Sequence, residues 1–197
     1  MYLIGGNHRK TISAILGTTL GVLISGLSAW IFGLAADIDG YNVSNIETLV
    51  YLGQNTQIKI GGLLFAGILI ASLGAVMDVA MSVSSAIAEI HDKSKTLGMK
   101  ELFISGMHVG KDMMGTMSNT LILAFAGGSI SVLVLDYAYN LPLRQIINSY
   151  SIGIEIMQGI AGSIGVILTV PTTAFMAALL YGAKRNITVQ SSQEDTQ

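Results

Sequence analysis

The chain contains no cysteine and little charge. The absence of cysteine among 197 residues excludes disulfide frameworks, thiolate metal sites and cysteine nucleophiles. Charged residues make up only 11% of the chain, against about a quarter in a typical soluble domain. Hydrophobic residues account for 51% and the mean hydropathy is +0.63. So few charged residues are not enough to form the surface of a soluble globular protein. The composition therefore predicts a protein that is embedded in lipid.

Four long apolar segments follow one another along the chain, over residues 11–36, 60–88, 116–136 and 158–183. Each reaches the length of about 20 residues that a helix needs to cross a hydrocarbon core of about 30 Å. None shows the alternation expected of a membrane strand. Helices satisfy their own backbone groups in lipid. We therefore predict an all-α integral membrane protein with four transmembrane helices, the first retained rather than removed as a signal peptide.

Positive charge predicts the orientation. Eight of the ten basic residues fall on one side of the four predicted spans: Arg9, Lys10, Lys93, Lys95, Lys100, Lys111, Lys184 and Arg185. The positive-inside rule makes that side cytoplasmic, so both termini are expected inside the cell. Residues 1–185 are predicted to form one membrane domain, and 186–197 a polar, disordered cytoplasmic tail. Short interfacial helices are expected within 99–115 on the inner side and 141–156 on the outer side.

Small residues recur every four positions in the first span, at Gly17, Gly21 and Ser25, and less regularly around Gly162 in the fourth. Such stripes allow two helix backbones to approach closely. We interpret them as helix-packing surfaces. They do not by themselves indicate a transport pathway.

The second span carries a different pattern, because one of its faces is polar. Asp78 lies at helical spacing with a set of small and polar residues: Gly74, Ser82, Ser85 and Glu89. Counting back from about residue 86 places Asp78 roughly 12 Å inside the membrane at 1.5 Å per residue. An ionised carboxylate at such a position costs at least about 2.5–3.5 kcal/mol.

Three polar residues of the third span enter the membrane from the same side at a similar depth: Thr116, Asn119 and Thr120. They are the expected partners of Asp78, directly or through water. On one hypothesis, Asp78 and these residues form a proton or cation site. On the other, a neutral or hydrogen-bonded Asp78 joins the second and third helices. Pro171, near the middle of the fourth span, removes a backbone donor and is expected to kink that helix.

The sequence lacks the residues that other membrane-protein chemistries would need. An intramembrane aspartyl protease needs a second facing aspartate, and Asp136 is too far from Asp78 in depth. All three histidines (His8, His91 and His108) are expected in cytoplasmic segments, so no serine–histidine dyad forms in the membrane. No metal site or cofactor is expected, and we expect no enzyme. The net charge of −2 does not point to nucleic acid, which is not expected as a partner.

Several stretches together resemble the YibE/F-like family of bacterial membrane proteins: "RKTISAILGT" (9–18), "AVMDVAMS" (75–82), "SGMHVGKDMMGTMSNTLILA" (105–124) and "GSIGVILTVP" (162–171). The resemblance runs from about residue 4 to 182. It implies a multi-spanning, permease-like protein of the bacterial cytoplasmic (plasma) membrane. The family pattern includes Asp78, Asp112, Gly115, Thr116, Asn119, Thr120 and Pro171. Typical members look longer, which implies a split pair or a shortened product.

These observations favour a permease or transporter subunit, coupled to protons or cations through Asp78. The alternative is a membrane scaffold or assembly subunit that does not transport. In both cases the expected partners are the lipid bilayer and either a longer homologous subunit or a second copy of the chain.

Overall fold

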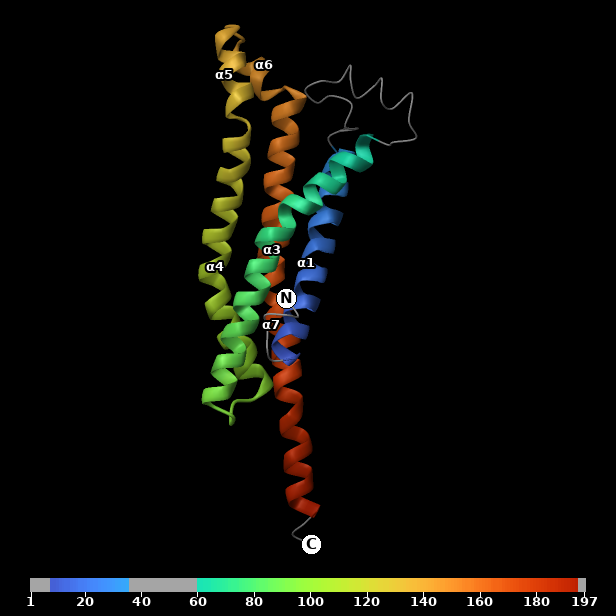
Figure 1. Cartoon of the computed structure of the whole chain (residues 1–197), viewed down its shortest axis with the longest axis vertical. Coiled ribbons are helices and arrows are strands. Elements are labelled where there is room, and N and C mark those ends of the chain that lie inside the picture. The colour runs from blue at the N-terminus through green and yellow to red at the C-terminus, as the bar shows by residue number, and fades with distance from the viewer. Residues whose placement is uncertain (1–7, 36–59, 195–197) are drawn as a thin grey trace.

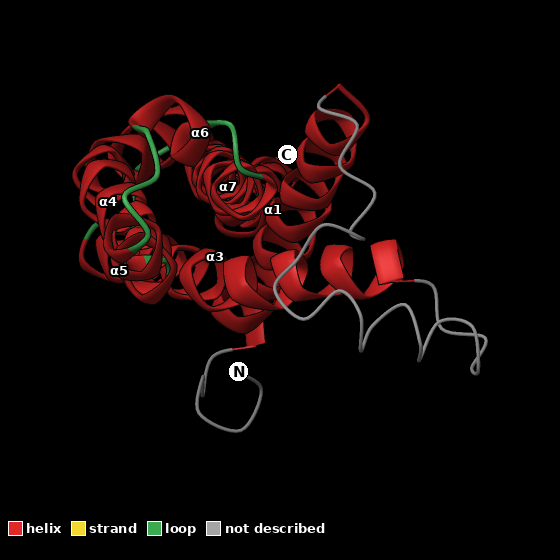
Figure 2. Cartoon of the chain, turned by 90° about the horizontal axis from the view of Figure 1, so that it is seen from above, coloured by secondary structure: helices red, strands yellow, loops and turns green. Residues whose placement is uncertain are grey.

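The computed structural model describes residues 8–35 and 60–194, and every element in these ranges is an α-helix. The helices are α1 (His8–Ala35), α3 (Ile60–Lys93), α4 (Met99–Gly128), α5 (Ile130–Ala138), α6 (Leu143–Ile147) and α7 (Tyr150–Glu194). The long helices run side by side along one axis (Figure 1), and α7 lies among the others when the bundle is viewed from above (Figure 2). The predicted all-α fold is confirmed. Residue 36 of the first predicted span and residues 195–197 of the tail lie outside the described ranges.

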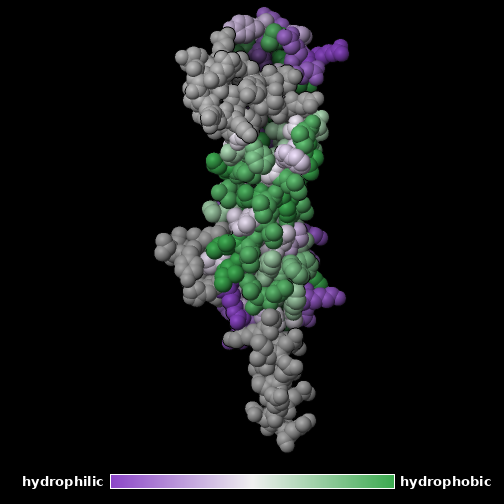
Figure 3. All heavy atoms as spheres, turned by 90° about the vertical axis from the view of Figure 1, so that its right-hand side faces the viewer, coloured by the Kyte–Doolittle hydropathy of each residue, from purple (hydrophilic) through white to green (hydrophobic). Residues whose placement is uncertain are grey.

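Three helices are long and apolar enough to cross a membrane, over Arg9–Ala35, Phe65–Lys93 and Ser151–Gly182. A fourth span arises only if α4 and α5, which are bent by 42° at their junction, are counted together. On the face shown in Figure 3, hydrophobic side chains cover most of the middle of the bundle, and hydrophilic side chains lie above and below them. The described ranges thus hold three spans, or four with the bent pair, and the four-span prediction agrees with the second count.

The small residues of α1 form its contact with α7. A Cβ atom on Gly17 would overlap Thr173, and one on Gly21 would overlap Thr169. Ser25 is fully buried, and its Cβ lies 2.6 Å from where a Cβ on Gly165 would stand. Gly17, Gly21 and Ser25 therefore lie in the contact between α1 and α7, where larger side chains would overlap the neighbouring helix.

The core lies between α3, α4 and α7. Its centre consists of fully buried aliphatic side chains: Val76, Val79, Val83 and Ile87 of α3, Leu102 of α4, and Val166 and Val170 of α7. On α3 these positions recur at three- and four-residue spacing, which places them on one face of the helix. Gly162 of α7 is also buried here, and a Cβ on it would stand 2.6 Å from Leu121 of α4.

The predicted interfacial helix within 99–115 is not a separate element. These residues form the first half of α4, which continues without interruption to Gly128. Gly106 and Gly110, four residues apart, are buried, and a Cβ on Gly110 would overlap Val170 of α7. The glycines let α4 approach α7 closely, so one side of this segment packs against α7 as part of the long helix.

The opposite end differs from the expectation in the same way. Only the five-residue α6 forms after Pro142, and residues 150–157 already belong to α7.

α7 also continues to Glu194, so the tail predicted to be disordered from residue 186 is helical to that point. No glycine or proline follows Gly182 to interrupt the helix. α7 likewise runs through Pro171 as one helix.

Candidate functional site

Asp78 lies near the middle of the second candidate span. It is the fourteenth of the 29 residues of Phe65–Lys93, so about 20 Å of helix separates it from either end. The side chain is exposed, and it stands about 200° around α3 from the fully buried Val76. Asp78 therefore points away from the core of the bundle.

The three polar residues expected to surround Asp78 are on α4, and all three are exposed. The Thr116 hydroxyl donates to the Asp112 carbonyl at 3.1 Å, and the Thr120 hydroxyl donates to the Thr116 carbonyl at 2.9 Å. Both threonines thus bond to their own helix. Within the described ranges no hydrogen bond or ion pair joins Asp78 to Thr116, Asn119 or Thr120. The polar groups lie on the outside of the bundle, on the two neighbouring helices.

The other predicted members of this face vary in their surroundings. A Cβ on Gly74 would meet nothing within 4 Å, so the helix surface beside Asp78 is open. Ser82 is half-buried, and the Ser85 hydroxyl donates to the Met81 carbonyl at 2.6 Å. Glu89 forms an exposed ion pair with Lys93 at 3.1 Å, which adds little stability.

Pro171 is half-buried in α7 and cannot donate to the Ile167 carbonyl. The next residue, Thr172, donates its hydroxyl to the carbonyls of Leu168 (2.9 Å) and Thr169 (3.0 Å). The backbone beside the proline is therefore supported by side-chain hydrogen bonds, which helps α7 to continue.

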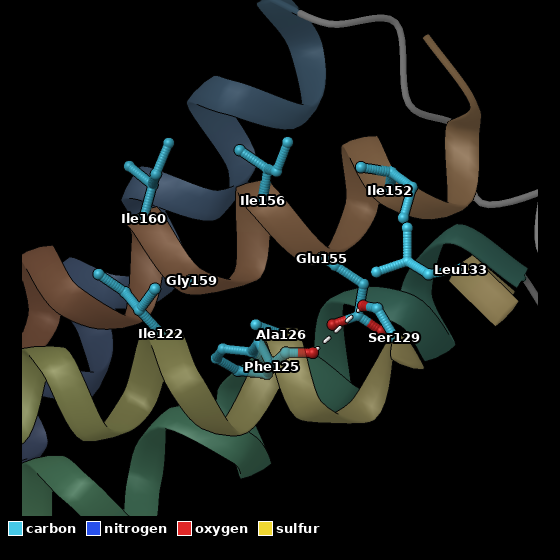
Figure 4. A pocket seen from close by; sticks show the side chains of 10 residues that line it. All are labelled: Ile122, Phe125, Ala126, Ser129, Leu133, Ile152, Glu155, Ile156, Gly159 and Ile160. Carbon is cyan, nitrogen blue, oxygen red and sulfur yellow. Dashed lines mark hydrogen bonds between the residues drawn. The ribbon is translucent and has the colours of Figure 1, made fainter. Parts of the chain in front are cut away.

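A second feature, a cavity of about 310 Å³ between α4, α5 and α7, was not expected from the sequence. Its walls are mainly apolar, and they include Phe125, Ile152, Ile156 and Ile160. Glu155 of α7 lines it from one side and extends toward Ser129, at the junction of α4 and α5 (Figure 4).

By the charge pattern along the chain, Glu155 falls on the outer side of the predicted spans, where few basic residues lie. Two signals in "SIGIEIMQGI" point to the cavity wall: Ile152, Ile156 and Ile160 recur every four residues, and Glu155 stands four residues before Gly159. The cavity itself depends on the bend between α4 and α5, which no local pattern indicates.

The fold and the site define a class of protein. Apolar helices long enough to span a membrane pack into a bundle that carries a carboxylate near the middle of one span, so this is a polytopic α-helical membrane protein. A family model described as YibE/F-like protein matches residues 1–183, and the chain belongs to that family. The comparison with curated proteins and the comparison with solved structures each returned no match.

Proposed function

We propose that the chain is a permease or transporter subunit in which Asp78 binds a proton or a cation at a site completed by a second membrane-embedded chain. One observation carries the proposal: Asp78 is exposed near the middle of its span, and no described residue bonds to it. A carboxylate at that depth, turned outward from its own bundle, requires a polar environment from elsewhere.

An ionised carboxylate facing hydrocarbon costs about 2.5–3.5 kcal/mol, and more in some estimates. Protonation, a bound cation or a polar partner removes that cost. Gly74 and Asn119, which are exposed as well, provide a small and a polar position on α3 and α4. A helix from a longer homologous subunit or from a second copy could pack closely against this surface and form hydrogen bonds with it.

One observation favours a second candidate function, that of a non-transporting scaffold. The core that the structure describes is closed by direct contacts between glycines and neighbouring side chains, such as Gly110 with Val170. Its two described cavities have mainly apolar walls. Neither these contacts nor these two cavities provide an aqueous path through the described residues. As a scaffold subunit, it would use Asp78 to hold the partner chain.

The experiment compares Asp78→Asn and Asp78→Glu with the original chain in membrane vesicles from expressing cells. Proton and cation fluxes are followed with ion-sensitive dyes, and the native complex is sized in mild detergent. The transporter proposal expects Asp78→Asn to lose flux with the complex intact, and Asp78→Glu to keep part of it. Asp92→Asn, at an exposed residue near the end of α3, is the matched control.

Unchanged flux in Asp78→Asn rejects the coupling role. A complex that dissociates in Asp78→Asn, with no flux in the original chain, supports the scaffold instead.

A further inference from the structure

We propose that the cavity between α4, α5 and α7 is a binding site for an amphiphilic amine, a protonated amino group attached to an alkyl or aryl body, which enters from the bilayer. This site is separate from Asp78, which lies on the outer face of α3.

The polar groups of the wall are both acceptors. An ionised Glu155 carboxylate only accepts hydrogen bonds. The Ser129 hydroxyl donates a hydrogen bond to the Phe125 carbonyl at 3.2 Å (Figure 4). Its oxygen lone pairs remain to accept a hydrogen bond from a ligand. A ligand that satisfies both groups must therefore be a donor, and a positive charge on it compensates that of the carboxylate.

No basic side chain lines the cavity, and no ion pair among the described residues involves Glu155. The carboxylate is half-buried among apolar side chains, where water solvates it incompletely. The ring of Phe125 is also part of the wall, and aromatic rings attract cations that lie over their faces. Charge complementarity thus selects a cation over an anion or a neutral lipid tail.

The position of Glu155 selects an amphiphile rather than a small ion. It is the fifth residue of the span Ser151–Gly182, about 6 Å from its beginning, where a charged headgroup meets the hydrocarbon. Deeper in the membrane the wall continues with Ile156 and Ile160, which are 52% and 44% exposed and accommodate an apolar body.

Gly159 provides a way to close the cavity without changing its charge. A Cβ on Gly159 would stand 3.8 Å from Phe125 and 3.9 Å from Ile122, which is ordinary contact. Gly159→Ala is therefore tolerated. Gly159→Leu places three further carbon atoms in the space between α7 and α4.

The test uses photolabelling of the full chain in lipid nanodiscs. The probes are an alkyl amine that carries a diazirine and the alcohol of the same chain length, and the labelled peptides are identified by mass spectrometry. We expect the amine to label residues 122–133 and 152–160 about tenfold more than the alcohol does. Glu155→Gln should reduce amine labelling to the level of the alcohol, and Gly159→Leu should reduce labelling by both probes.

The controls are Gly159→Ala and Asp136→Asn, which should both keep the preference for the amine. Asp136 is a carboxylate of α5 that does not line the cavity. If a variant fails to fold, competition on the original chain decides: an excess of unlabelled amine, and not of alcohol, should protect the cavity. Equal labelling by amine and alcohol, or an amine preference that survives Glu155→Gln, overturns the proposal and leaves a groove for lipid tails. Neither result bears on Asp78.

Discussion

Gly21 of α1 lies directly against Thr169 of α7, and a Cβ atom at Gly21 would overlap the Thr169 hydroxyl oxygen. The same Cβ would stand 2.8 Å from Cγ1 of Val76 in α3. Gly21 is therefore the point where α1, α3 and α7 meet, and the absence of a side chain there lets all three pack together. The Thr169 hydroxyl is engaged elsewhere, donating to the Gly165 carbonyl at 2.6 Å.

Adding one methyl group at this junction should destabilise the bundle. We expect Gly21→Ala to lower the free energy of unfolding by about 1–3 kcal/mol, the usual cost of overpacking. Gly67→Ala is the matched control, because a Cβ there meets nothing within 4 Å. It should leave stability unchanged or raise it by up to about 1 kcal/mol. Denaturant titration of both variants in the same detergent makes the comparison, and equal effects would contradict this account of the junction.

The contact between α1 and α3 contains a buried pair of hydroxyls. The oxygens of Ser13 and Ser84 lie 2.5 Å apart, and they lie 2.9 and 2.7 Å from the Lys10 carbonyl. We expect a coupling of about 0.6 kcal/mol between Ser13→Ala and Ser84→Ala, as interhelical hydrogen bonds in membranes show. A double-mutant cycle on unfolding measures it. Additive effects would show that the hydroxyls do not act as a pair.

Asp78 contributes no described contact within the chain, so its removal should not weaken the isolated bundle. We expect Asp78→Ala to change the free energy of unfolding of the purified chain by no more than about 0.5 kcal/mol. Ser84→Ala, measured in parallel, shows that the assay detects a lost buried contact. A marked loss of stability in Asp78→Ala would mean that Asp78 joins helices inside one chain, as the sequence alone also allowed.

The absence of cysteine makes the proposed partner surface directly testable. A cysteine at Gly74, beside Asp78, should form a disulfide with the same cysteine of a second copy under mild oxidation in native membranes, provided that their Cα atoms come within about 7 Å. Ala80→Cys is the control, because Ala80 is fully buried. Dimers in Gly74→Cys alone support a homo-oligomer. Their absence, with copurification of another membrane chain, favours the longer homologous subunit.

Two turns at opposite ends of the bundle test the orientation predicted from charge (Figure 1). Gly98 precedes α4, and Asn140 lies between α5 and α6 with a φ of 54°. In intact cells, an impermeant maleimide should label Asn140→Cys and not Gly98→Cys, because the basic residues on the Gly98 side are retained in the cytoplasm. Permeabilised cells should show labelling of both. The reverse pattern in intact cells would invert the topology.

Local patterns account for much of the architecture. The length and hydropathy of the apolar segments are enough to predict helices in lipid, since lipid leaves the backbone no other way to satisfy its hydrogen bonds. The four-residue spacing of Gly17, Gly21 and Ser25 likewise predicts a close helix contact, and the structure assigns it to α7. Patterns of this kind can be read from sequence because they depend on neighbours within one helix.

Other features depend on neighbours that are distant in sequence. The amphipathic pattern of residues 99–115 is typical of a surface helix, yet Gly106 and Gly110 bring this segment against α7 as part of α4. The charge pattern places Glu155 only on the outer side of the predicted spans, yet it lines a cavity between α4, α5 and α7. A helix face of this kind is compatible with either a membrane surface or a neighbouring helix. Packing across the bundle decides which of the two it contacts.

By itself, the sequence determined that this is a helical membrane protein. Its composition and the length of its apolar segments indicate a lipid environment, and in lipid the backbone must form its hydrogen bonds within helices. It also determined that one span carries a carboxylate deep within it. Only the tertiary structure decided the direction of that carboxylate, because Val76, Val79 and Val83 commit one face of α3 to the core and turn Asp78 outward. The same packing decided that the groups which could receive a ligand lie on two separate surfaces.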